Sequence, residues 1–290
     1  MPGRPLVTDE EAEARGFVGH ECRRRRAALR ETLEAFQGAV PRDRYHQLAV
    51  RNLQRWHESS KSHDSLIVEV LPGDWGDVTG ELTAKYGHCF AVLTMANAFV
   101  PGGAYSEGAV AQEENLFRRS DCHFHISDHE YDPASDRYHP ATTRLLLAQD
   151  GLVYLDSRAP RVCIRGPEDR SRTDLGYRWL EEQEVFSFFE LRASAQDLRG
   201  GILFNEEEAT RRISAQFATL KAHGIRHVVF GAFGCGAFKN PADRVARIYR
   251  EEILKHGSEF SVIAFAIFHA GYGPNNYEHF ADALADWRTA

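Results

Sequence analysis

The chain has 290 residues, of which 43% are hydrophobic and 27% are charged, and its formal net charge at pH 7 is −7. This composition suits one elaborated globular domain, and the negative charge excludes a protein that coats nucleic acid by bulk attraction. No apolar run approaches the roughly 18 residues of a membrane span, and the amino-terminal sequence lacks a secretory signal pattern. We therefore expect a cytoplasmic protein without membrane contact, acting as a monomer.

The cysteines also favour a reducing compartment. They are odd in number and form no CxxC pair, a spacing that does not fit a disulfide framework. The positions are Cys22, Cys89, Cys122, Cys163 and Cys235.

The first part of the chain is predicted to be helical. Thr8 and Glu11 have the spacing of a capping box, and residues 21–36 carry apolar side chains at helical intervals until Pro41 breaks the pattern. The four arginines at 23–26 are interpreted as a solvated helix face in preference to a nucleic-acid patch. The stretch from 41 to 64 is more polar. We expect residues 1–65 to form a helical extension packed on a core at 66–290, together one structural unit.

The core begins with alternating strands and helices. Residues 66–71 and 90–96 are apolar and predict strands, the second buried on both faces, with a short helix at 78–86 between them that ends at Gly87. Residues 122–140 are polar and without periodicity, which predicts an exposed loop. Residues 144–155 are predicted to form a hairpin that turns at Asp150 and Gly151.

The last third of the chain is the most regular. We predict strands at 185–194, 227–233 and 261–268 and helices at 206–222 and 241–255, the second capped by Asn240 and opened by Pro241. Strands that alternate with helices imply parallel βαβ units. The sequence therefore predicts an α/β fold.

A glycine-rich turn precedes two adjacent glutamates, directly after the strand at 90–96. Gly102 and Gly103 lie in this turn, and Glu113 and Glu114 follow. Glycines let a backbone approach a ligand closely, and a helix start offers unpaired N–H groups to phosphate. The carboxyl end of a buried strand is also where open α/β sheets place ligands.

A second glycine-rich run follows the strand at 227–233. It contains Gly231, Gly234 and Gly236 but lacks the GK[ST] sequence of a nucleoside-triphosphate loop. Cys235 has no visible base beside it, so an inert thiol is favoured over a nucleophile. Two loops suited to phosphate indicate a nucleotide diphosphate; for the second loop the alternative is a tight turn that needs glycine only for packing.

The first run resembles the signature of the poly(ADP-ribose) glycohydrolase family, in which three glycines precede QEE. The matching positions are Gly102, Gly103, Ala104, Gln112, Glu113 and Glu114. Ala104 departs from the pattern, because it stands where the third glycine would be. The layout from about 66 to 280 resembles the compact bacterial form. The resemblance implies a macrodomain-like three-layer α/β/α sandwich with a mixed, largely parallel sheet and an N-terminal helical extension.

The same resemblance implies roles for individual residues. Glu114 would be the general acid, Glu113 would hold ribose hydroxyls, Gln112 would support both, and Asn97 would bind the distal ribose, although a turn-stabilising role for Asn97 fits as well. The second loop would wrap the diphosphate. Its residues are Gly234, Cys235, Gly236, Ala237 and Phe238. An aromatic near the last strand, Phe268, Tyr272 or Tyr277, would stack on adenine.

The implied activity is that of an ADP-ribosyl glycohydrolase that cleaves poly(ADP-ribose) and releases ADP-ribose, without a cofactor. A mono-ADP-ribosyl hydrolase acting on modified protein or nucleic acid is one alternative, and a non-catalytic ADP-ribose-binding macrodomain is another. A metal-dependent nucleotide hydrolase is disfavoured, because the acidic ligands that it needs are not apparent.

Two further groups have competing interpretations. Cys122, His123, His125 and His129 lie close in sequence, but neither CxxC nor HExxH is present, so we expect no metal site. Asp74 and Trp75 would approach the adenine end of a ligand, but core packing of the tryptophan is favoured.

Overall fold

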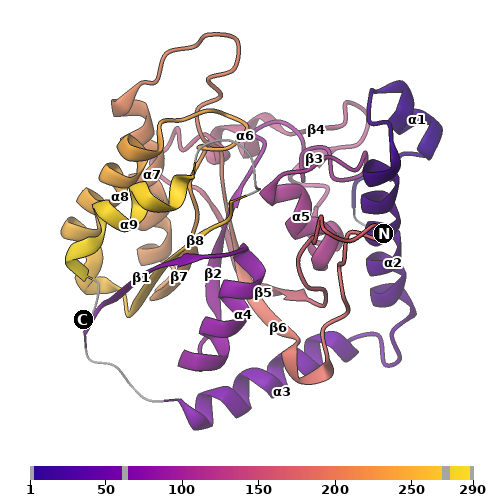
Figure 1. Ribbon diagram of the computed structural model, residues 1–290, viewed down its shortest axis with the longest axis horizontal. Helices are drawn as coiled ribbons and strands as arrows, with labels where there is room; N and C mark the ends of the chain where they lie inside the picture. Colours follow the sequence, from indigo (N-terminus) through magenta and orange to yellow (C-terminus); the bar gives the residue numbers. More distant parts are fainter. Residues whose placement is uncertain (1–2, 61–64, 270–274, 288–290) are drawn as a thin grey trace.

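The computed structural model describes residues 3–60, 65–269 and 275–287. In this part of the chain a six-stranded sheet has the order β1-β8-β7-β2-β6-β5 (Figure 1). Neighbouring strands are parallel except β5, which runs antiparallel to β6 at one edge. The strands are β1 (Ile67–Pro72), β2 (Phe90–Met95), β5 (Tyr154–Cys163), β6 (Phe186–Ala193), β7 (His227–Phe230) and β8 (Val262–Ile267), with a separate pair formed by β3 (Tyr131–Asp132) and β4 (Arg137–Tyr138).

The helices surround this sheet, and none in the described chain is long and apolar enough to cross a membrane. The α-helices are α1 (Asp9–Ala14), α2 (His20–Gly38), α3 (Arg44–Ser59), α4 (Trp75–Tyr86), α5 (Gln112–Arg119), α6 (Pro140–Leu146), α7 (Glu206–Ala222), α8 (Ala242–His256) and α9 (Asn276–Ala283). Short 3-10 turns are η1 (Cys122–His125), η2 (Glu182–Glu184), η3 (Gly257–Glu259) and η4 (Ala285–Trp287).

Alternate residues of each central strand pack on opposite faces of the sheet. In β2, Ala91 and Leu93 join the core beneath α7 and α8, whereas Phe90 and Val92 join the core beneath α2, α4 and α5. Because successive side chains of a strand point to opposite faces, an unbroken apolar strand needs helices on both sides. Figure 1 shows α7, α8 and α9 grouped on one side, with α1 and α2 at the opposite side of the molecule. The predicted three-layer α/β/α sandwich with a mixed, largely parallel sheet is confirmed.

The parallel strands bring several loops to one edge of the sheet. β1, β2, β6, β7 and β8 run in the same direction, so the segments that follow them all leave from their carboxyl ends. Both glycine-rich loops follow such strands, one after β2 and the other after β7, and β2 and β7 are direct neighbours. This edge of the sheet is where a ligand site is expected in an α/β fold.

One expectation for the amino-terminal part is wrong. The basic run of α2 is only partly solvated, because Arg25 and Arg26 are buried and hydrogen-bonded to acidic side chains. The polar stretch after Pro41, which the sequence places in the helical extension, contains helix α3, and this helix buries Leu48, Ala49 and Asn52 against the core.

The middle segment also differs from expectation. The predicted hairpin at 144–155 is instead the end of α6 followed by a turn, and β5 pairs with β6. Pro140 at the start of α6 fixes a helical φ, which outweighs the Asp150-Gly151 turn signal. The segment 122–140 is not an exposed loop, because Cys122, Tyr131 and Tyr138 are buried there.

The carboxyl-terminal elements follow the prediction closely. Helix α7 has the expected bounds, Glu206–Ala222, and β8 lies within the predicted strand. Asn240 does not cap α8: the helix begins at Ala242 after Pro241, and the Asn240 amide is used inside the preceding loop. Tyr272, considered as an adenine contact, lies outside the described residues.

Candidate active site

Gln112 fixes the start of α5 to the end of β2. Its Oε1 accepts a hydrogen bond from the Met95 N–H at 3.0 Å, and its Nε2 donates to the Leu93 carbonyl at 2.9 Å. A side-chain amide that satisfies one donor and one acceptor of a strand end acts like an additional strand residue. Gln112 therefore sets the place from which the two glutamates project.

Glu113 points from α5 towards the segment that leaves β2. Its Oε2 accepts a hydrogen bond from the backbone N–H of Asn97 at 2.7 Å. Its Oε1 is buried and receives no hydrogen bond from the described residues. A buried carboxylate oxygen without a partner is costly, and such groups are frequent where a ligand supplies the missing donor.

Glu114 points into the glycine-rich turn. Its Oε1 accepts a hydrogen bond from the Ala104 N–H at 3.1 Å, and its side chain lies directly against Gly103. Glu114 is 9% exposed and Glu113 is 3% exposed. Both carboxyls are thus withdrawn from bulk water, and Glu114 is the more accessible of the two.

Burial changes the protonation of both carboxyls. Desolvation raises the pKa of Glu113 well above its usual value, and the neighbouring charge of Glu114 raises it further. Desolvation also raises the pKa of Glu114, although the Ala104 N–H, by hydrogen bonding to the ionised form, partly opposes this. The pair therefore holds a proton more readily than exposed glutamates do, as general acid catalysis requires.

The glycines of the turn are needed for shape. Gly102 and Gly103 have φ values of 70° and 58°, in the left-handed region that side chains other than glycine rarely adopt. A Cβ at Gly103 would overlap Glu114 Oε1, and it would lie 3.1 Å from Glu113 Oε2. Ala104 replaces the third glycine of the family pattern, and its backbone N–H is nevertheless directed at Glu114.

The second loop is organised around Gly234 and Asn240. Gly234 has a φ of 74°, and a Cβ there would overlap Ala195 and the Asn240 amide. Asn240 Nδ2 donates to the Gln196 carbonyl at 2.8 Å and to the Gly234 carbonyl at 3.0 Å. By contrast, a Cβ at Gly236 would meet no atom of the described chain within 4 Å, so the backbone there faces open space.

The other residues expected in this loop differ in how far they are buried. Burial raises the pKa of the Cys235 thiol, which suits the inert role predicted for it. Phe238 packs against the core next to the loop, and the Arg199 guanidinium lies 5.1 Å from the centre of its ring. Ala237 directly precedes Phe238 in this loop. Phe268 follows β8 at the same edge of the sheet and is 56% exposed.

The two loops lie at one edge because their strands are paired. Met95 is the last residue of β2, and its Cε would lie 3.5 Å from a Cβ at Gly231, the first residue after β7. The Asn97 side chain is occupied in the first loop, where its Oδ1 accepts from the N–H groups of Phe99 and Val100. That contact favours the turn-stabilising interpretation of Asn97.

Arg4 is a contributor to the glycine turn that the sequence did not indicate. Its guanidinium is 4% exposed and donates to the Gly103 carbonyl at 2.8 Å and to Glu107 Oε1 at 3.1 Å. Arg26 donates to the Glu107 carbonyl at 3.0 Å, and Arg15 pairs with the Glu107 carboxylate at 2.6 Å. Nothing local marks Arg4, which lies 99 positions before Gly103.

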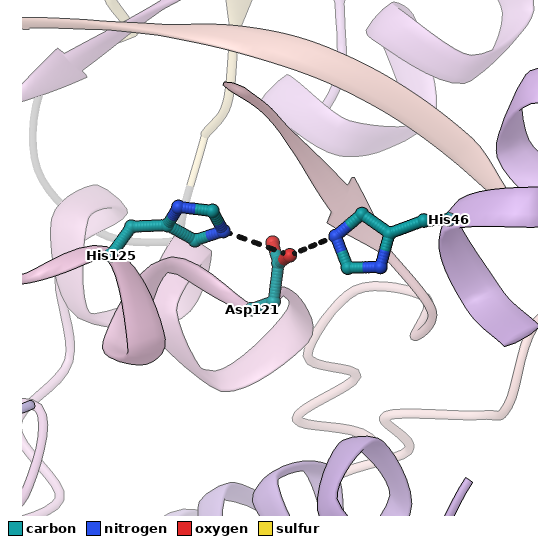
Figure 2. Close-up of side chains that lie close together, drawn as sticks. All are labelled: His46, Asp121 and His125. Atoms are coloured by element: carbon teal, nitrogen blue, oxygen red, sulfur yellow. Dashed lines mark hydrogen bonds and ion pairs between the residues drawn. The ribbon is translucent and has the colours of Figure 1, made fainter. Parts of the chain in front are cut away.

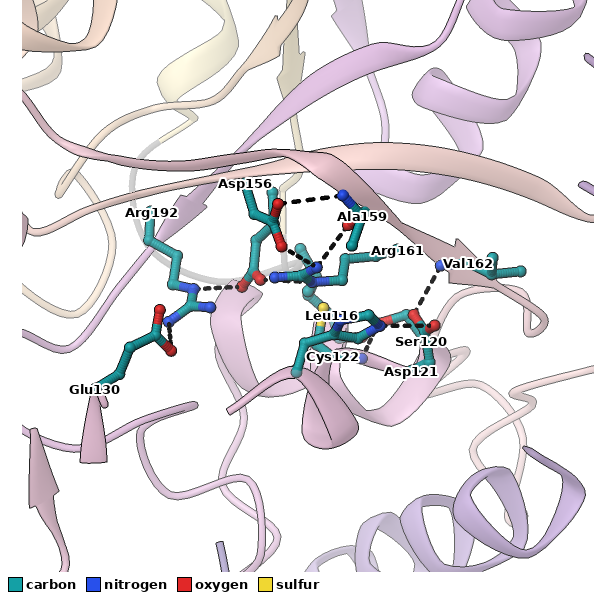
Figure 3. A network of polar contacts seen from close by, with 12 residues as sticks. Leu116, Ser120, Asp121, Cys122, Glu130, Asp156, Ala159, Arg161, Val162 and Arg192 are labelled. Carbon is teal, nitrogen blue, oxygen red and sulfur yellow. Dashed lines mark hydrogen bonds and ion pairs between the residues drawn. The ribbon is translucent and has the colours of Figure 1, made fainter. Parts of the chain in front are cut away.

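A buried charge network links side chains of β5 and β6 (Figure 3). Glu190 of β6 pairs with Arg161 at 3.1 Å and with Arg192 at 3.0 Å, and Arg192 reaches Glu130 at 3.5 Å. The charges of Glu190 and Arg192 also act on the pKa of Glu113, in opposite directions. Glu190 and Arg192 are two positions apart in the predicted strand, so their side chains face the same side of the sheet. Only the fold shows that this side of β6 lies near Glu113.

The two remaining groups that the sequence singled out, Asp74 with Trp75 and the histidine-rich segment, make contacts within the protein. Trp75 is buried and donates through Nε1 to Asn115 Oδ1 at 3.0 Å, which agrees with core packing. Asp74 caps α4 and pairs with Arg119. In the histidine-rich segment, His123 Nδ1 lies 2.8 Å from the Tyr105 hydroxyl, whereas His125 faces Asp121.

Comparisons with known proteins agree with this architecture. A family profile described as microbial-type PARG, catalytic domain, matches residues 22–156, somewhat less than half of the chain. A search of curated protein sequences returned no significant relative. The resemblance stated from the QEE motif is confirmed over the matched region, which contains both glutamates.

Solved structures show the same fold. Poly(ADP-ribose) glycohydrolase from Thermomonospora curvata is 22% identical, with a TM-score of 0.63, over 89% of this chain and 98% of that one. A structure of the T. curvata enzyme bound to the inhibitor ADP-HPD is 24% identical, with a TM-score of 0.62 and the same coverage. The Deinococcus radiodurans enzyme in complex with ADP-ribose is 21% identical, with a TM-score of 0.59, over 84% and 92% of the two chains.

Proposed function

Since residues 22–156 match the family profile of microbial-type PARG catalytic domains, we propose that this protein hydrolyses the ribose O-glycosidic bond of poly(ADP-ribose) and releases ADP-ribose. The observation that carries the proposal is the pair of buried carboxyls at the start of α5, with Glu114 against Gly103 and Glu113 against the Asn97 N–H. Solved relatives that bind ADP-ribose or ADP-HPD support the ligand class.

In the proposed reaction, Glu114 is the general acid. Its carboxyl proton passes to the leaving oxygen of the ribose to ribose bond while that bond breaks and positive charge develops on the anomeric carbon. Water then adds to that carbon, and the ionised Glu114 takes the proton released from the water. The products are ADP-ribose and a polymer shortened by one unit. The raised pKa of Glu114 supports this role, because the acid must be protonated near neutral pH.

Glu113 and the two loops position the substrate in this proposal. The buried Oε1 of Glu113 has no donor in the described chain, and a ribose hydroxyl would supply one. Gly236 faces open space, which leaves room for a diphosphate beside the backbone of the second loop. Gln112 and Arg4 act as positioning residues, because each holds backbone next to the glutamates without a role in proton transfer.

Assays of ADP-ribose release test the proposal. We expect the wild-type protein to release ADP-ribose from poly(ADP-ribose), and Glu114→Gln to lower the rate by about 10²–10⁴-fold, because the amide has no acidic proton to transfer. Binding of ADP-ribose, measured by calorimetry, should be largely retained in this variant. The matched control is Glu207→Gln, which alters an exposed glutamate in the first turn of α7 and should leave the rate unchanged.

Other outcomes have definite meanings. A Glu114→Gln variant with wild-type activity would remove Glu114 from the mechanism. Release only from proteins with arginine-, serine- or glutamate-linked mono-ADP-ribose would identify a mono-ADP-ribosyl hydrolase. Binding of ADP-ribose without release from any of these substrates would identify a non-catalytic binding protein.

Three finer expectations belong to the same proposal. We infer a cytoplasmic location, supported by five cysteines that are all free, and we retain a monomeric state. We also retain the helical extension at 1–65 and the core at 66–290 as one unit, an interpretation supported by the buried Arg4 and Arg26, which bond to the glycine turn.

A further inference from the structure

Two histidines and an aspartate converge on one point at the surface between α3 and η1 (Figure 2). The Nε2 atom of His46 lies 2.9 Å from Asp121 Oδ2, and the Nε2 atom of His125 lies 3.1 Å from the same oxygen. All three potential ligand atoms lie within 4.8 Å of one another. His46 comes from α3, whereas Asp121 directly precedes η1 and His125 is its last residue, so the cluster exists only in the folded protein.

The aspartate is held in place from the opposite side. Asp121 Oδ1 accepts a hydrogen bond from the Val162 N–H at 2.7 Å, so Oδ2 is turned towards the two imidazoles. The Asp121 side chain is 2% exposed, whereas those of His46 and His125 are 42% and 23% exposed. The cluster therefore has a fixed anionic base and an opening through which an ion and water can enter. A backbone bond that orients a ligating carboxylate is also a common feature of metal sites.

Two of the three separations between ligand atoms are close to those around a tetrahedral ion, and the third is below 4.8 Å. Bonds of about 2.0–2.1 Å to nitrogen and oxygen place the ligand atoms of such an ion roughly 3.3 Å apart. The two measured edges, 2.9 and 3.1 Å, need only slight outward movement of exposed imidazole rings. Imidazole nitrogens with one carboxylate oxygen form a ligand set that suits zinc.

From this geometry we propose that His46, Asp121 and His125 form a binding site for one zinc ion, with water as the fourth ligand. On binding, any proton on either Nε2 is released, and each nitrogen lone pair bonds to the metal. The proposal does not depend on the glycohydrolase activity. It also differs from the sequence expectation, because only His125 of the histidine-rich segment takes part and His46 is contributed by a distant helix.

The position of this site gives the ion a structural role. Asp121 lies just beyond the carboxyl end of α5, whose first turn carries Glu113 and Glu114. The eight residues of α5 span roughly 12 Å, so the ion does not contact the reacting atoms. Bound zinc would join α3 of the helical extension to the segment that follows the glutamate-bearing helix.

Zinc titration of the full chain tests the proposal. After dialysis against a chelator and then into chelator-free buffer, we expect calorimetry to show one zinc ion bound per chain, and zinc to raise Tm. His46→Ala and His125→Ala should each weaken binding by about tenfold or more, since each removes one ligand. Asp121→Asn, in which the amide oxygen can still accept from the Val162 N–H, should also weaken it. Magnesium, which prefers oxygen ligands, should neither bind nor raise Tm.

The control is His129→Ala, which removes an exposed histidine of the same segment that is not part of the cluster. It should bind zinc as the wild type does. Failure of the wild type to bind zinc stoichiometrically would overturn the proposal, as would equal zinc affinity in His46→Ala and the wild type. His46 lies on an accessible part of α3, and circular dichroism of the zinc-free variant checks that it is folded.

Discussion

The two glycine-rich loops at the carboxyl edge of the sheet are stabilised in different ways. The loop after β2 is held by groups from far along the chain: Arg4 bonds the Gly103 carbonyl, Arg26 bonds the Glu107 carbonyl, and the Tyr138 N–H bonds the Phe99 carbonyl at 2.7 Å. The loop after β7 is closed mainly from within, where Asn240 bonds the Gly234 carbonyl through both its side-chain amide and its backbone N–H.

The two modes of stabilisation reflect what each loop carries: the loop after β2 surrounds acidic side chains, whereas the loop after β7 has only its backbone available for a ligand. The first loop must accommodate two buried carboxyls and Glu107, so it requires cationic partners from the amino-terminal segment. The second loop has open space at Gly236 and carries no buried carboxylate, so a short turn closed by an asparagine is sufficient. The helical extension is therefore bound directly to the candidate catalytic loop.

Alanine at one glycine of each loop gives the largest expected effect. Gly103→Ala should lower kcat/KM by about 10²-fold and also lower Tm, because the left-handed backbone costs roughly 1–2 kcal/mol with a side chain and the Cβ overlaps Glu114. Gly236→Ala should leave Tm unchanged but weaken ADP-ribose binding. Thermal unfolding and calorimetry measure the two effects. An equal decrease in Tm in both variants would contradict the expectation that stability depends on glycine at position 103 but not at position 236.

Removal of the Arg4 guanidinium should give an intermediate effect. Arg4→Ala leaves the Gly103 carbonyl and the buried Glu107 with fewer partners, which should lower the free energy of unfolding by about 1–3 kcal/mol. We also expect kcat to fall by roughly tenfold, because misplacement of the turn moves the Ala104 N–H away from Glu114. Both quantities are measured at a temperature where the variant remains folded.

The control for Arg4 is Arg23→Ala, which breaks an exposed ion pair with Glu13 and should change stability by no more than about 0.5 kcal/mol. Arg4→Lys should restore part of kcat, because the ammonium can still reach one of the acceptors. An Arg4→Ala variant with lowered stability but wild-type kcat would show that the amino-terminal segment supports the fold without positioning the turn.

The pH dependence of stability should give the smallest effect. The pKa of Glu113 is raised in the folded state, so the native protein binds more protons than the unfolded chain, and stability falls as pH rises above the ordinary value of 4.5. Glu113→Gln removes this loss, because the amide does not ionise. We expect the variant to be more stable than wild type at pH 8 and to show a flatter profile.

Denaturant unfolding across the pH range measures this effect. Asp243→Asn, an exposed carboxylate at the start of α8 beyond the second loop, is the control and should leave the profile unchanged. A Glu113→Gln variant that follows the wild-type profile would show that Glu113 remains ionised in the folded protein.

Several elements could be predicted because their signals are local. Helix α7 has its apolar stripe and its stop at Gly224 within one segment, and the strands β2 and β8 are short apolar runs rich in β-branched and aromatic residues, as buried strands are. The spacing of the glycine run and the two glutamates is likewise readable along the chain. The prediction of a hairpin at 144–155 was wrong because a local turn signal competed with a helix start at Pro140.

By itself, the sequence determined the α/β class, the order of the regular elements in the last third of the chain and the segment that bears Glu113 and Glu114, because periodicity and motif spacing act over a few residues. Tertiary structure alone decided that Arg4 bonds Gly103, that Glu190 and Arg192 lie behind Glu113, and that His46 meets Asp121 and His125. These contacts join residues far apart in the chain. Their energies depend on burial and on distances of about 3 Å, which are fixed only when the sheet and its helices pack.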